Sequence, residues 1–396
     1  TIANAAAIVQ NGDVRGIYHK SFLPNYSVFD EARYFSKGTE PNTLFWYDDI
    51  AIGINICEDI WIEDGPAEEQ VKQGASLIIN INASPYDIHK SETRKEIVMK
   101  KALKLNVPII YLNMVGGQDE LVFDGGSFVV NDLGEIIYQA SSFKEEVFHL
   151  DIDLKTNKQN DKSPLIIRPK TIELKDVESK ASLSKNESIY SALKLGLKDY
   201  VRKNKFTKVL IGISGGIDSA LTAAICVDAL GAENVIGVAM PSKYNSKDSL
   251  EDAIKLSDNL GINLKTIEIE KLVDEFRDIL TNSLNEELGQ ITDENIQSRV
   301  RGNILMGLSN QTGAMVVSTG NKSEMAVGYS TLYGDLAGGF ALIKDLYKTK
   351  VYELSNYRNS ISDAIPENII TKEPSAELRP NQFDSDSLPN YEVLDK

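Results

Sequence analysis

Cysteine and histidine are scarce in this chain of 396 residues, which contains two cysteines and three histidines. Cys57 and Cys226 lie far apart, so they offer neither a disulfide framework nor the spacing of a zinc site. A chain with so few thiols is typical of a reducing compartment, and we expect a cytoplasmic location. The histidines are scattered along the sequence, so no histidine metal cluster is predicted.

Positive charge is also in short supply. The chain has 42 Lys and Arg residues against 58 Asp and Glu residues, a formal net charge of −16. This balance argues against nucleic acid or an anionic membrane as the main partner. No apolar run approaches the length of a transmembrane helix, and the N-terminus lacks a signal pattern. A composition that is 42% hydrophobic and 25% charged predicts a globular protein of two or more domains.

A glycine-rich turn, SGGIDS, lies within residues 208–230 (KVLIGISGGIDSALTAAICVDAL). The β-branched residues before it predict a buried strand, and the apolar spacing after it predicts a helix. Gly215 and Gly216 allow a ligand to approach the main chain, Ile217 and the residues after it begin a helix whose free N–H groups face an anion, and Ser214 and Ser219 add hydroxyl donors.

The usual phosphate-binding loop carries a lysine, whereas this turn carries Asp218, so a divalent cation has to supply the positive charge. The turn therefore predicts a site for Mg²⁺ and pyrophosphate. The alternative interpretation is an ordinary glycine turn.

The second half of the chain alternates strands and helices. The predicted strands Val235–Met240 and Leu264–Ile269 flank a helix at Ser249–Leu260, which predicts a doubly wound, Rossmann-like parallel sheet over residues 181–396. A second glycine-bearing turn at residues 318–321 precedes a helix that carries Glu324. We expect this carboxylate to face Asp218 and complete the Mg²⁺ site. The glycine-rich residues 328–339 are predicted to form a binding loop.

The first half, residues 1–154, also alternates strands and helices and is predicted to be a separate α/β domain. Residues 155–180, rich in Lys, Asp, Asn and Ser, are the predicted linker. Cys57 comes directly after the buried strand Ile50–Ile56, where a thiol can be exposed. A lone cysteine is more often a small buried hydrophobe, and Cys226, within a helix, is interpreted in that way.

Three segments change the interpretation of Cys57: residues 19–35, residues 55–61 (NICEDIW) and residues 82–90 (NASPYDIHK). In order and spacing they resemble the glutamine-amide hydrolase domain of the nitrilase superfamily, which implies an α/β sandwich. The resemblance implies Cys57 as nucleophile and Lys20 as the cation beside the oxyanion, because a thiolate and a positioned cation are what the chemistry requires. It also implies that Tyr26, Ser84 and Lys90 surround glutamine, with Glu31 as a second acidic residue near the lysine.

The general-base glutamate of that family lies upstream of the lysine segment, and no glutamate precedes Lys20 here. Since Thr1 begins in mid-domain, we expect the amidase domain to be truncated at its N-terminus. The prediction is that this chain hydrolyses glutamine poorly or not at all.

The segments ENIQSRVRG (294–302), TGNKSEMAVGYSTLYGD (319–335) and EPSAELRP (373–380) resemble the NAD synthetase family. The family belongs to the adenine nucleotide alpha hydrolase-like enzymes, which adenylate an oxygen and then displace AMP. A nitrilase-type domain ahead of it marks the glutamine-dependent form. The resemblance also implies that the chain is truncated at its C-terminus.

Position by position, the resemblance implies two sets of binding residues beside the Mg²⁺ ligands Asp218 and Glu324. The set expected around ATP is Ser214, Gly215, Gly216, Ile217, Asp218, Ser219 and Thr319. The set expected around deamido-NAD or the transferring phosphate is Asn295, Arg299, Glu324, Asp335, Lys348 and Ser375.

The function implied is ATP-dependent amidation of deamido-NAD to NAD with ammonia from glutamine, through an internal tunnel in a homo-oligomer. Two alternatives stay open from the sequence. One is a stand-alone amide hydrolase with a nucleotide-sensing domain, which would turn over glutamine without forming AMP. The other is a non-catalytic fragment that only binds nucleotide.

Overall fold

A computed structural model describes residues 2–40, 43–156 and 179–396. The chain divides into two compact units. Unit 1 comprises Thr1–Gly116 and Leu121–Ser184, and unit 2 comprises Gly117–Glu120 and Lys185–Lys396. The predicted linker, residues 155–180, lies largely outside the described residues. No helix in the described ranges is long and apolar enough to cross a membrane.

Unit 1 is built on a six-stranded mixed sheet of order β10-β9-β6-β5-β4-β3, in which β4, β5 and β6 are parallel. Its strands are β1 (Ala5–Gln10), β2 (Asp13–His19), β3 (Leu44–Tyr47), β4 (Ile50–Ile56), β5 (Leu77–Asn82), β6 (Ile109–Asn113), β8 (Leu121–Asp124), β9 (Phe128–Val130) and β10 (Ile136–Gln139). Strand β7 (Val115–Gln118) begins in unit 1, and its last two residues belong to unit 2. Its helices are α1 (Glu31–Tyr34), the 3₁₀ turn η1 (Cys57–Ile60), α2 (Pro66–Lys72) and α3 (Lys90–Leu105). The β1–β2 hairpin forms a separate two-stranded sheet through a turn at Asn11 and Gly12, both with positive φ.

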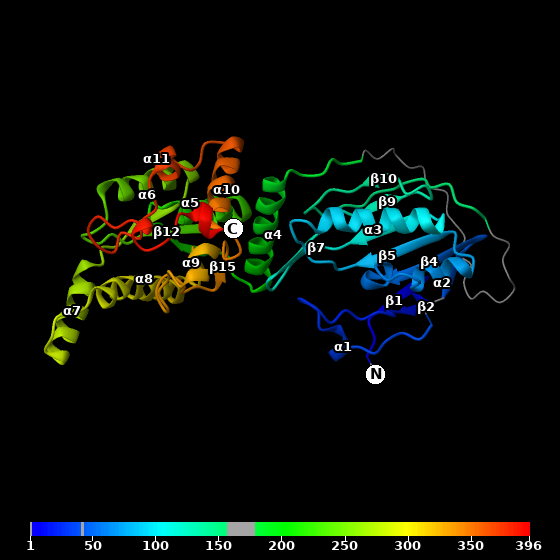
Figure 1. Cartoon of the computed structure of the whole chain (residues 1–396), viewed down its shortest axis with the longest axis horizontal. Coiled ribbons are helices and arrows are strands. Elements are labelled where there is room, and N and C mark those ends of the chain that lie inside the picture. The colour runs from blue at the N-terminus through cyan, green and yellow to red at the C-terminus, as the bar shows by residue number, and fades with distance from the viewer. Residues whose placement is uncertain (1, 41–42, 157–178) are drawn as a thin grey trace. The chain divides into compact units, whose positions relative to one another are not determined.

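One face of this sheet is covered by α2 and α3, as Figure 1 shows. Val98 and Ala102 of α3 pack with Ile78 of β5 and Ile109 of β6 in one buried cluster. Side chains alternate between the two faces of a strand, so Ile78 enters this core while Ile79 packs on the other side with the residues around Cys57. The predicted α/β sandwich domain is confirmed.

Unit 2 is a five-stranded parallel sheet of order β13-β12-β11-β14-β15. Its strands are β11 (Val209–Gly212), β12 (Val235–Ala239), β13 (Asn263–Thr266), β14 (Met315–Ser318) and β15 (Phe340–Ala341). Its helices are α4 (Lys185–Lys203), α5 (Ile217–Leu230), η2 (Ala232–Asn234), α6 (Lys247–Leu260), α7 (Glu270–Leu284), α8 (Gln290–Thr312), α9 (Lys322–Val327), α10 (Lys348–Ile361), α11 (Glu367–Thr371), η3 (Asp384–Asp386) and α12 (Tyr391–Leu394).

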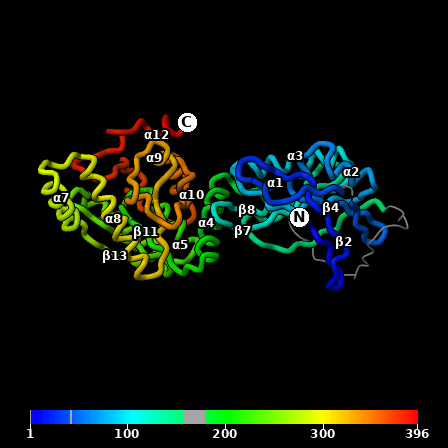
Figure 2. Tube along the Cα trace, turned by 90° about the horizontal axis from the view of Figure 1, so that it is seen from below, coloured from blue at the N-terminus to red at the C-terminus, as the bar shows by residue number. Residues whose placement is uncertain are grey.

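Helices cover both faces of the unit 2 sheet, which confirms the doubly wound fold. Val209 and Ile211 of β11 pack against α4, α5, α6 and α10, whereas Leu210 between them packs against α7 and α8. Figure 1 shows α5 and α8 on opposite sides of β12, and both views show α7 beside α8. In Figure 2, α12 lies beside α9, where Ser323 Oγ donates to Asp395 Oδ1 at 2.5 Å.

The strand order places a topological switch between β11 and β14, because the chain leaves β11 toward β12 and later returns to its other side. In such sheets ligands bind beyond the carboxyl ends of the strands at the switch point. Both predicted glycine turns, after β11 and after β14, lie there.

Candidate active sites

In unit 1 the candidate nucleophile occupies a sharp turn. Cys57 follows the last residue of β4 and has φ +46°, in the left-handed region that non-glycine residues rarely adopt. The turn is held by Asp59, whose Oδ2 accepts from the Ile56 N–H at 3.0 Å and from the Tyr18 hydroxyl at 2.9 Å. Asp59 Oδ1 accepts from the N–H groups of Ser21 and Phe22, directly after Lys20. One buried carboxylate therefore joins the cysteine turn to the lysine segment.

Lys20 is 1% exposed and donates to both carboxylate oxygens of Glu31, at 2.7 and 2.8 Å. Burial raises the pKa of the Cys57 thiol to about 11, and Lys20 acts in the opposite direction by favouring the thiolate. The structure thus brings Cys57, Lys20 and Glu31 together as predicted, with the thiol protonated at neutral pH.

The three predicted glutamine-binding residues differ in their surroundings. The Tyr26 hydroxyl donates to Glu58 Oε2 at 2.9 Å, next to the nucleophile in sequence. Ser84 Oγ accepts from Arg94 Nε at 3.1 Å, and Lys90 Nζ lies 4.6 Å from the centre of the Trp61 ring. Among the described residues, no hydrogen bond joins Ser84 or Lys90 to Cys57.

In unit 2 the SGGIDS turn is stabilised by hydrogen bonds between its main chain and its own serine hydroxyls. The Ser214 N–H donates to Ser219 Oγ at 3.2 Å, and the Gly216 N–H donates to Ser214 Oγ at 3.1 Å. Gly215 has φ +80°, and Gly216 is the residue before the first turn of α5. The turn thus presents main-chain and hydroxyl groups at the start of a 14-residue helix, an arrangement that suits a phosphate.

The turn after β14 meets the first one through Asp218. Asn321 begins α9 by accepting from the Glu324 N–H, and its Nδ2 donates to Asp218 Oδ1 at 2.8 Å. Lys348, at the start of α10, lies between the two predicted metal ligands, with Nζ 2.5 Å from Asp218 Oδ2 and 3.3 Å from Glu324 Oε1. Glu324 and Asp218 therefore converge as predicted.

The charges of this cluster are mutually dependent. Burial and the neighbouring Asp218 raise the pKa of the Glu324 carboxyl above its usual range. Burial opposes the charge of Lys348, but the two carboxylates prevail and raise its pKa well above the ordinary lysine value. Within the described ranges no three metal-type side chains form a cluster. A cation held by Asp218 and Glu324 would take its other ligands from phosphate and water, and that oxygen-only set fits Mg²⁺.

These groups line a cavity of about 930 Å³. Of the predicted residues it is lined by Ser214, Gly216, Ile217, Asp218, Asn295, Thr319, Glu324, Asp335, Lys348 and Ser375. Gly215, Ser219 and Arg299 are not among its lining residues; the first two shape the turn behind it. Residues from 328 to 337, within the predicted binding loop, also line the cavity.

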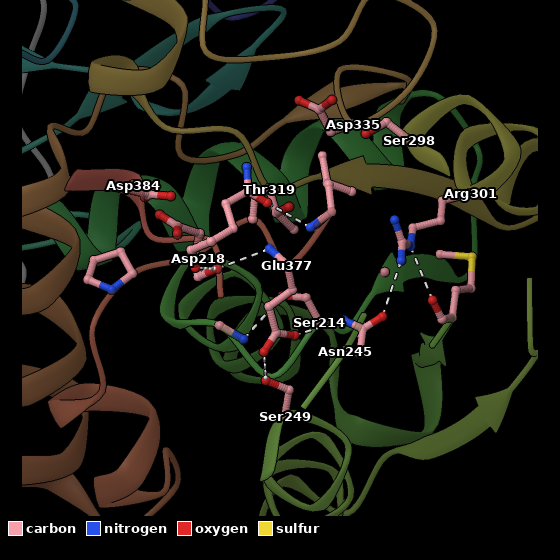
Figure 3. A pocket seen from close by; sticks show the side chains of 18 of the residues that line it. Ser214, Asp218, Asn245, Ser249, Ser298, Arg301, Thr319, Asp335, Glu377 and Asp384 are labelled. Carbon is pink, nitrogen blue, oxygen red and sulfur yellow. Dashed lines mark hydrogen bonds between the residues drawn. The ribbon is translucent and has the colours of Figure 1, made fainter. Parts of the chain in front are cut away.

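The arginine of the ENIQSRVRG segment that lines the cavity is Arg301 and not Arg299. Arg301 donates to the Met240 carbonyl at 3.1 Å and to Asn245 Oδ1 at 3.3 Å, while Arg299 donates to the Leu332 carbonyl. In Figure 3, Arg301 and Asn245 lie at one end of the pocket and Asp218 at the other. Burial lowers the pKa of Arg301 to about 10, so the guanidinium stays charged at neutral pH.

Both halves of the chain match known protein families. The chain matches the family model described as carbon-nitrogen hydrolase over residues 2–160 and the model described as NAD synthase over residues 189–396. It is 47% identical over 409 residues to the glutamine-dependent NAD(+) synthetase of Aquifex aeolicus, covering 99% of this chain and 72% of that protein. The chain belongs to the glutamine-dependent NAD(+) synthetase family.

Other members of the glutamine-dependent NAD(+) synthetase family give the same result. The Acinetobacter baylyi protein is 45% identical, with 99% of this chain and 70% of that protein covered. The solved structure of the Acinetobacter baumannii enzyme in complex with ADP superimposes with a TM-score of 0.84 at 43% identity, covering 99% of this chain and 69% of that chain. The family predicted from the motifs is confirmed.

Several residues of this family member's sites were not predicted from its sequence. Glu377 lines the nucleotide cavity and accepts from Asn245 Nδ2, Ser246 Oγ and Ser249 Oγ at 2.8–2.9 Å, which fastens the EPSAELRP segment to α6. Asp59 and Glu58 stand beside Cys57. The sequence indicates a role for these two residues only through their place in the segment NICEDIW, because an acidic residue in a loop is usually solvated.

Proposed function

We propose that this chain amidates deamido-NAD to NAD with ATP and ammonia, and that Cys57 is the nucleophile that releases ammonia from glutamine. Since no glutamate precedes Lys20 in this sequence, we expect glutamine to be a poorer nitrogen source for it than ammonium. The observation that carries the proposal is the meeting of the two glycine turns at the switch point, where Asp218, Glu324 and Lys348 converge at one wall of a cavity large enough for two nucleotide moieties. Membership of the family supports it.

In the first step a carboxylate oxygen of the nicotinate moiety attacks the α-phosphorus of ATP, and the bond to pyrophosphate breaks. The Ser214–Gly216 turn holds the phosphates, Ser219 stabilises that turn through its hydrogen bonds to Ser214 and Gly216, and Thr319 lies beside the ribose or phosphate. Asp218 and Glu324 would hold Mg²⁺, which would supply positive charge to the departing pyrophosphate when bound. Lys348 adds a fixed cation at the same place, and Asn295, Asp335 and Ser375 line the part of the cavity assigned to deamido-NAD.

In the second step ammonia attacks the carbonyl carbon of the adenylate, and AMP leaves with the electron pair of the broken C–O bond. In unit 1, the Cys57 thiolate attacks the glutamine amide and Lys20 stabilises the oxyanion. The C–N bond breaks as the nitrogen takes a proton from solvent, ammonia leaves, and water hydrolyses the resulting thioester to glutamate and the free thiol. Tyr26, through Glu58, and Ser84 and Lys90 are the proposed glutamine contacts.

Three further features belong to the proposal. The first is that residues 155–180 link the two domains. The second is a reducing, cytoplasmic location, which is supported by the two free and buried cysteines. The third is that the chain forms a homo-oligomer. Support for the last comes from α7, where Leu272, Phe276 and Ile279 are 44–53% exposed. Light scattering after size exclusion measures the oligomeric state.

The decisive experiment measures AMP and NAD formed from ATP, Mg²⁺ and deamido-NAD, with ammonium in one tube and glutamine in the other. AMP and NAD in equal amounts with ammonium support the synthetase. Glutamine turnover that needs no ATP and yields no AMP would favour a stand-alone amide hydrolase. ATP binding without product in either tube would contradict the proposed activity and leave a nucleotide-binding protein.

A further inference from the structure

Glu377 lies in the wall of the nucleotide cavity and has no part in the two steps above. Its backbone is left-handed, with φ +49°, a conformation that residues with a side chain rarely adopt. Such strain is maintained only where the surrounding contacts fix it, and it is frequent at ligand sites. A functional role for the side-chain contacts of Glu377 is therefore expected.

The two oxygens of the Glu377 carboxylate have different partners. Oε1 accepts from Ser246 Oγ at 2.9 Å and from Ser249 Oγ at 2.8 Å, at the start of α6. Oε2 accepts from Asn245 Nδ2 at 2.8 Å, and Figure 3 shows Glu377 between Ser249 and Asn245. Helix α6 does not need the carboxylate in order to begin, because Ser246 already caps it by accepting from the Ser249 N–H. Helix capping therefore leaves the bond to Asn245 unexplained.

The bond from Asn245 to Glu377 fixes the orientation of the Asn245 amide. An ionised carboxylate can only accept, so the amide NH₂ must face Glu377 and the amide oxygen must face the other way. There Asn245 Oδ1 accepts from the Ser242 N–H at 2.7 Å and from Arg301 Nη2 at 3.3 Å. A reversed amide would place its NH₂ group against these two donors. Glu377 thus ensures that Asn245 presents an acceptor to Arg301.

Glu377 also acts on the charge of Arg301. Burial lowers the pKa of the guanidinium to about 10, and the charges of Glu377 and, from α7, Glu270 act in the opposite direction. Arg301 Nη1 donates to no acceptor within the described part of the chain, whereas Nε is held by the Met240 carbonyl. The guanidinium is therefore charged, oriented and able to donate to a ligand.

The position of Arg301 favours ATP as that ligand. Met240, which holds Arg301, is the residue after β12, and β12 is the neighbour of β11, whose turn is assigned to the ATP phosphates. In Figure 3, Asp218 and Asp384 lie at one end of the pocket, and Arg301 and Asn245 at the other. With the phosphates beside Asp218, the nucleoside part of ATP reaches toward Arg301.

We propose that Glu377 is a positioning residue for ATP, which acts through Asn245 to hold Arg301 at the nucleoside end of the bound nucleotide; this inference rests on the proposed function. Arg301 donates to acceptor atoms of the ribose or the adenine ring, and Glu377 itself does not touch ATP.

The test is a double-mutant cycle on the affinity for ATP, measured by titration calorimetry with the whole chain. Glu377→Gln keeps the shape of the side chain but replaces one carboxylate oxygen with an amide donor, so either Asn245 Nδ2 or the Ser246 N–H loses its acceptor. We expect the Kd for ATP to rise about tenfold, the size of a lost hydrogen bond to a charged group. Arg301→Met should raise this Kd at least as much.

The coupling between the two positions separates positioning from a merely structural role. In the Arg301→Met chain, adding Glu377→Gln should raise the Kd for ATP by less than about twofold, because Glu377 acts through Arg301. The affinity of Glu377→Gln for deamido-NAD should stay within about twofold of the parent value, since Arg301 is assigned to ATP. Asn245→Ala breaks the same link at its other end, so it should weaken ATP binding about as much as Glu377→Gln does.

The matched control is Glu367→Gln, the same substitution at an exposed position of α11 outside the cavity lining, which should leave the Kd for ATP as in the parent. An unchanged Kd in both Glu377→Gln and Asn245→Ala would overturn the inference. Equal weakening by Glu377→Gln with and without Arg301 would overturn it in favour of a role in holding α6, and an equal loss of deamido-NAD affinity in favour of a role in folding the segment.

The proposed function fails in a different way. A parent chain that binds ATP but forms no NAD with ammonium would refute the proposed function, while the coupling between Glu377 and Arg301 in ATP binding would still be measured. A parent chain that binds no ATP would refute both.

Discussion

Gly215 packs so closely on the main chain of Ser249 that a β-carbon at position 215 would overlap the Ser249 carbonyl oxygen. Gly215 also has φ +80°, where a side chain is strained by about 1–3 kcal/mol. We therefore expect Gly215→Ala to weaken ATP binding at least tenfold, about 1.4 kcal/mol. Titration calorimetry with ATP measures the loss.

Gly216→Ala is the control for that substitution within the same turn. Gly216 has ordinary backbone angles, and an added β-carbon meets only Ser214 Oγ at 3.2 Å. Its ATP affinity should stay within a few-fold of the parent. Equal losses of ATP affinity in the two variants would show that the close contact with Ser249 does not determine the conformation of the turn.

A second prediction concerns the two arginines of α8. Arg301 lines the cavity and is anchored by Met240 and Asn245, so Arg301→Met should raise the KM for ATP or deamido-NAD by tenfold or more. Arg299→Met should change either KM by less than about threefold, because the Arg299 side chain is exposed and donates to the Leu332 carbonyl instead of lining the cavity. Steady-state kinetics with ammonium as the nitrogen source compare the two variants. A larger rise in KM for Arg299→Met than for Arg301→Met would show that Arg299 is the arginine that contacts substrate.

A third prediction follows from the buried thiol. Because the pKa of Cys57 is raised to about 11, the thiolate fraction grows about tenfold per pH unit below that value. The rate of Cys57 alkylation by iodoacetamide should rise in this way from pH 7 to pH 10 with no plateau. The Cys57→Ala chain supplies the background from Cys226, which is fully buried. A plateau below pH 9 would mean that the thiol is already activated.

The ion pair beside Cys57 gives a fourth prediction with two opposite signs. Lys20 lowers the pKa of the thiol and Glu31 raises it. At pH 8, Lys20→Met should therefore slow alkylation, and Glu31→Gln should speed it. Far-ultraviolet circular dichroism checks that the buried substitution leaves unit 1 folded. Changes of the same sign in the two variants would rule out a purely electrostatic coupling.

The fifth prediction separates the two chemistries. Cys57→Ala should abolish glutamine-dependent NAD synthesis while ammonium-dependent synthesis stays near the parent rate, because the thiol is needed only to release ammonia. Asp218→Asn should abolish both, since the adenylating centre serves either nitrogen source. Retention of glutamine use by Cys57→Ala would remove Cys57 as the nucleophile.

The parts of the sites that lie within one motif could be predicted from the sequence. Ser214, Gly216 and Asp218 are placed by a single strand-to-helix turn, and their geometry follows from local backbone rules. Cys57 and Lys20 were identified in the same way, by motif, and they do converge.

The choice between Arg299 and Arg301 could not be made from the sequence. Two residues along a helix are rotated by about 200°, so one of the pair faces the cavity, and only the packing of α8 decides which. Asp384 and Asp59 were missed for a related reason. A carboxylate in a short turn is ordinarily solvated, and its burial is recognised only once its donors are known, which are Tyr391 for Asp384 and Tyr18 for Asp59.

The switch between β11 and β14 also has a consequence for how the protein is made. Asp218 and Lys348 are 130 residues apart along the chain. At a synthesis rate of ~5–20 residues per second, the ribosome releases the lysine roughly 7–26 s after the aspartate. Strand β14 (Met315–Ser318) is made before Lys348, but until Lys348 is added the nascent anion-binding turn lacks its cation, so we expect nucleotide to stabilise the growing domain only once α10 has begun to be made.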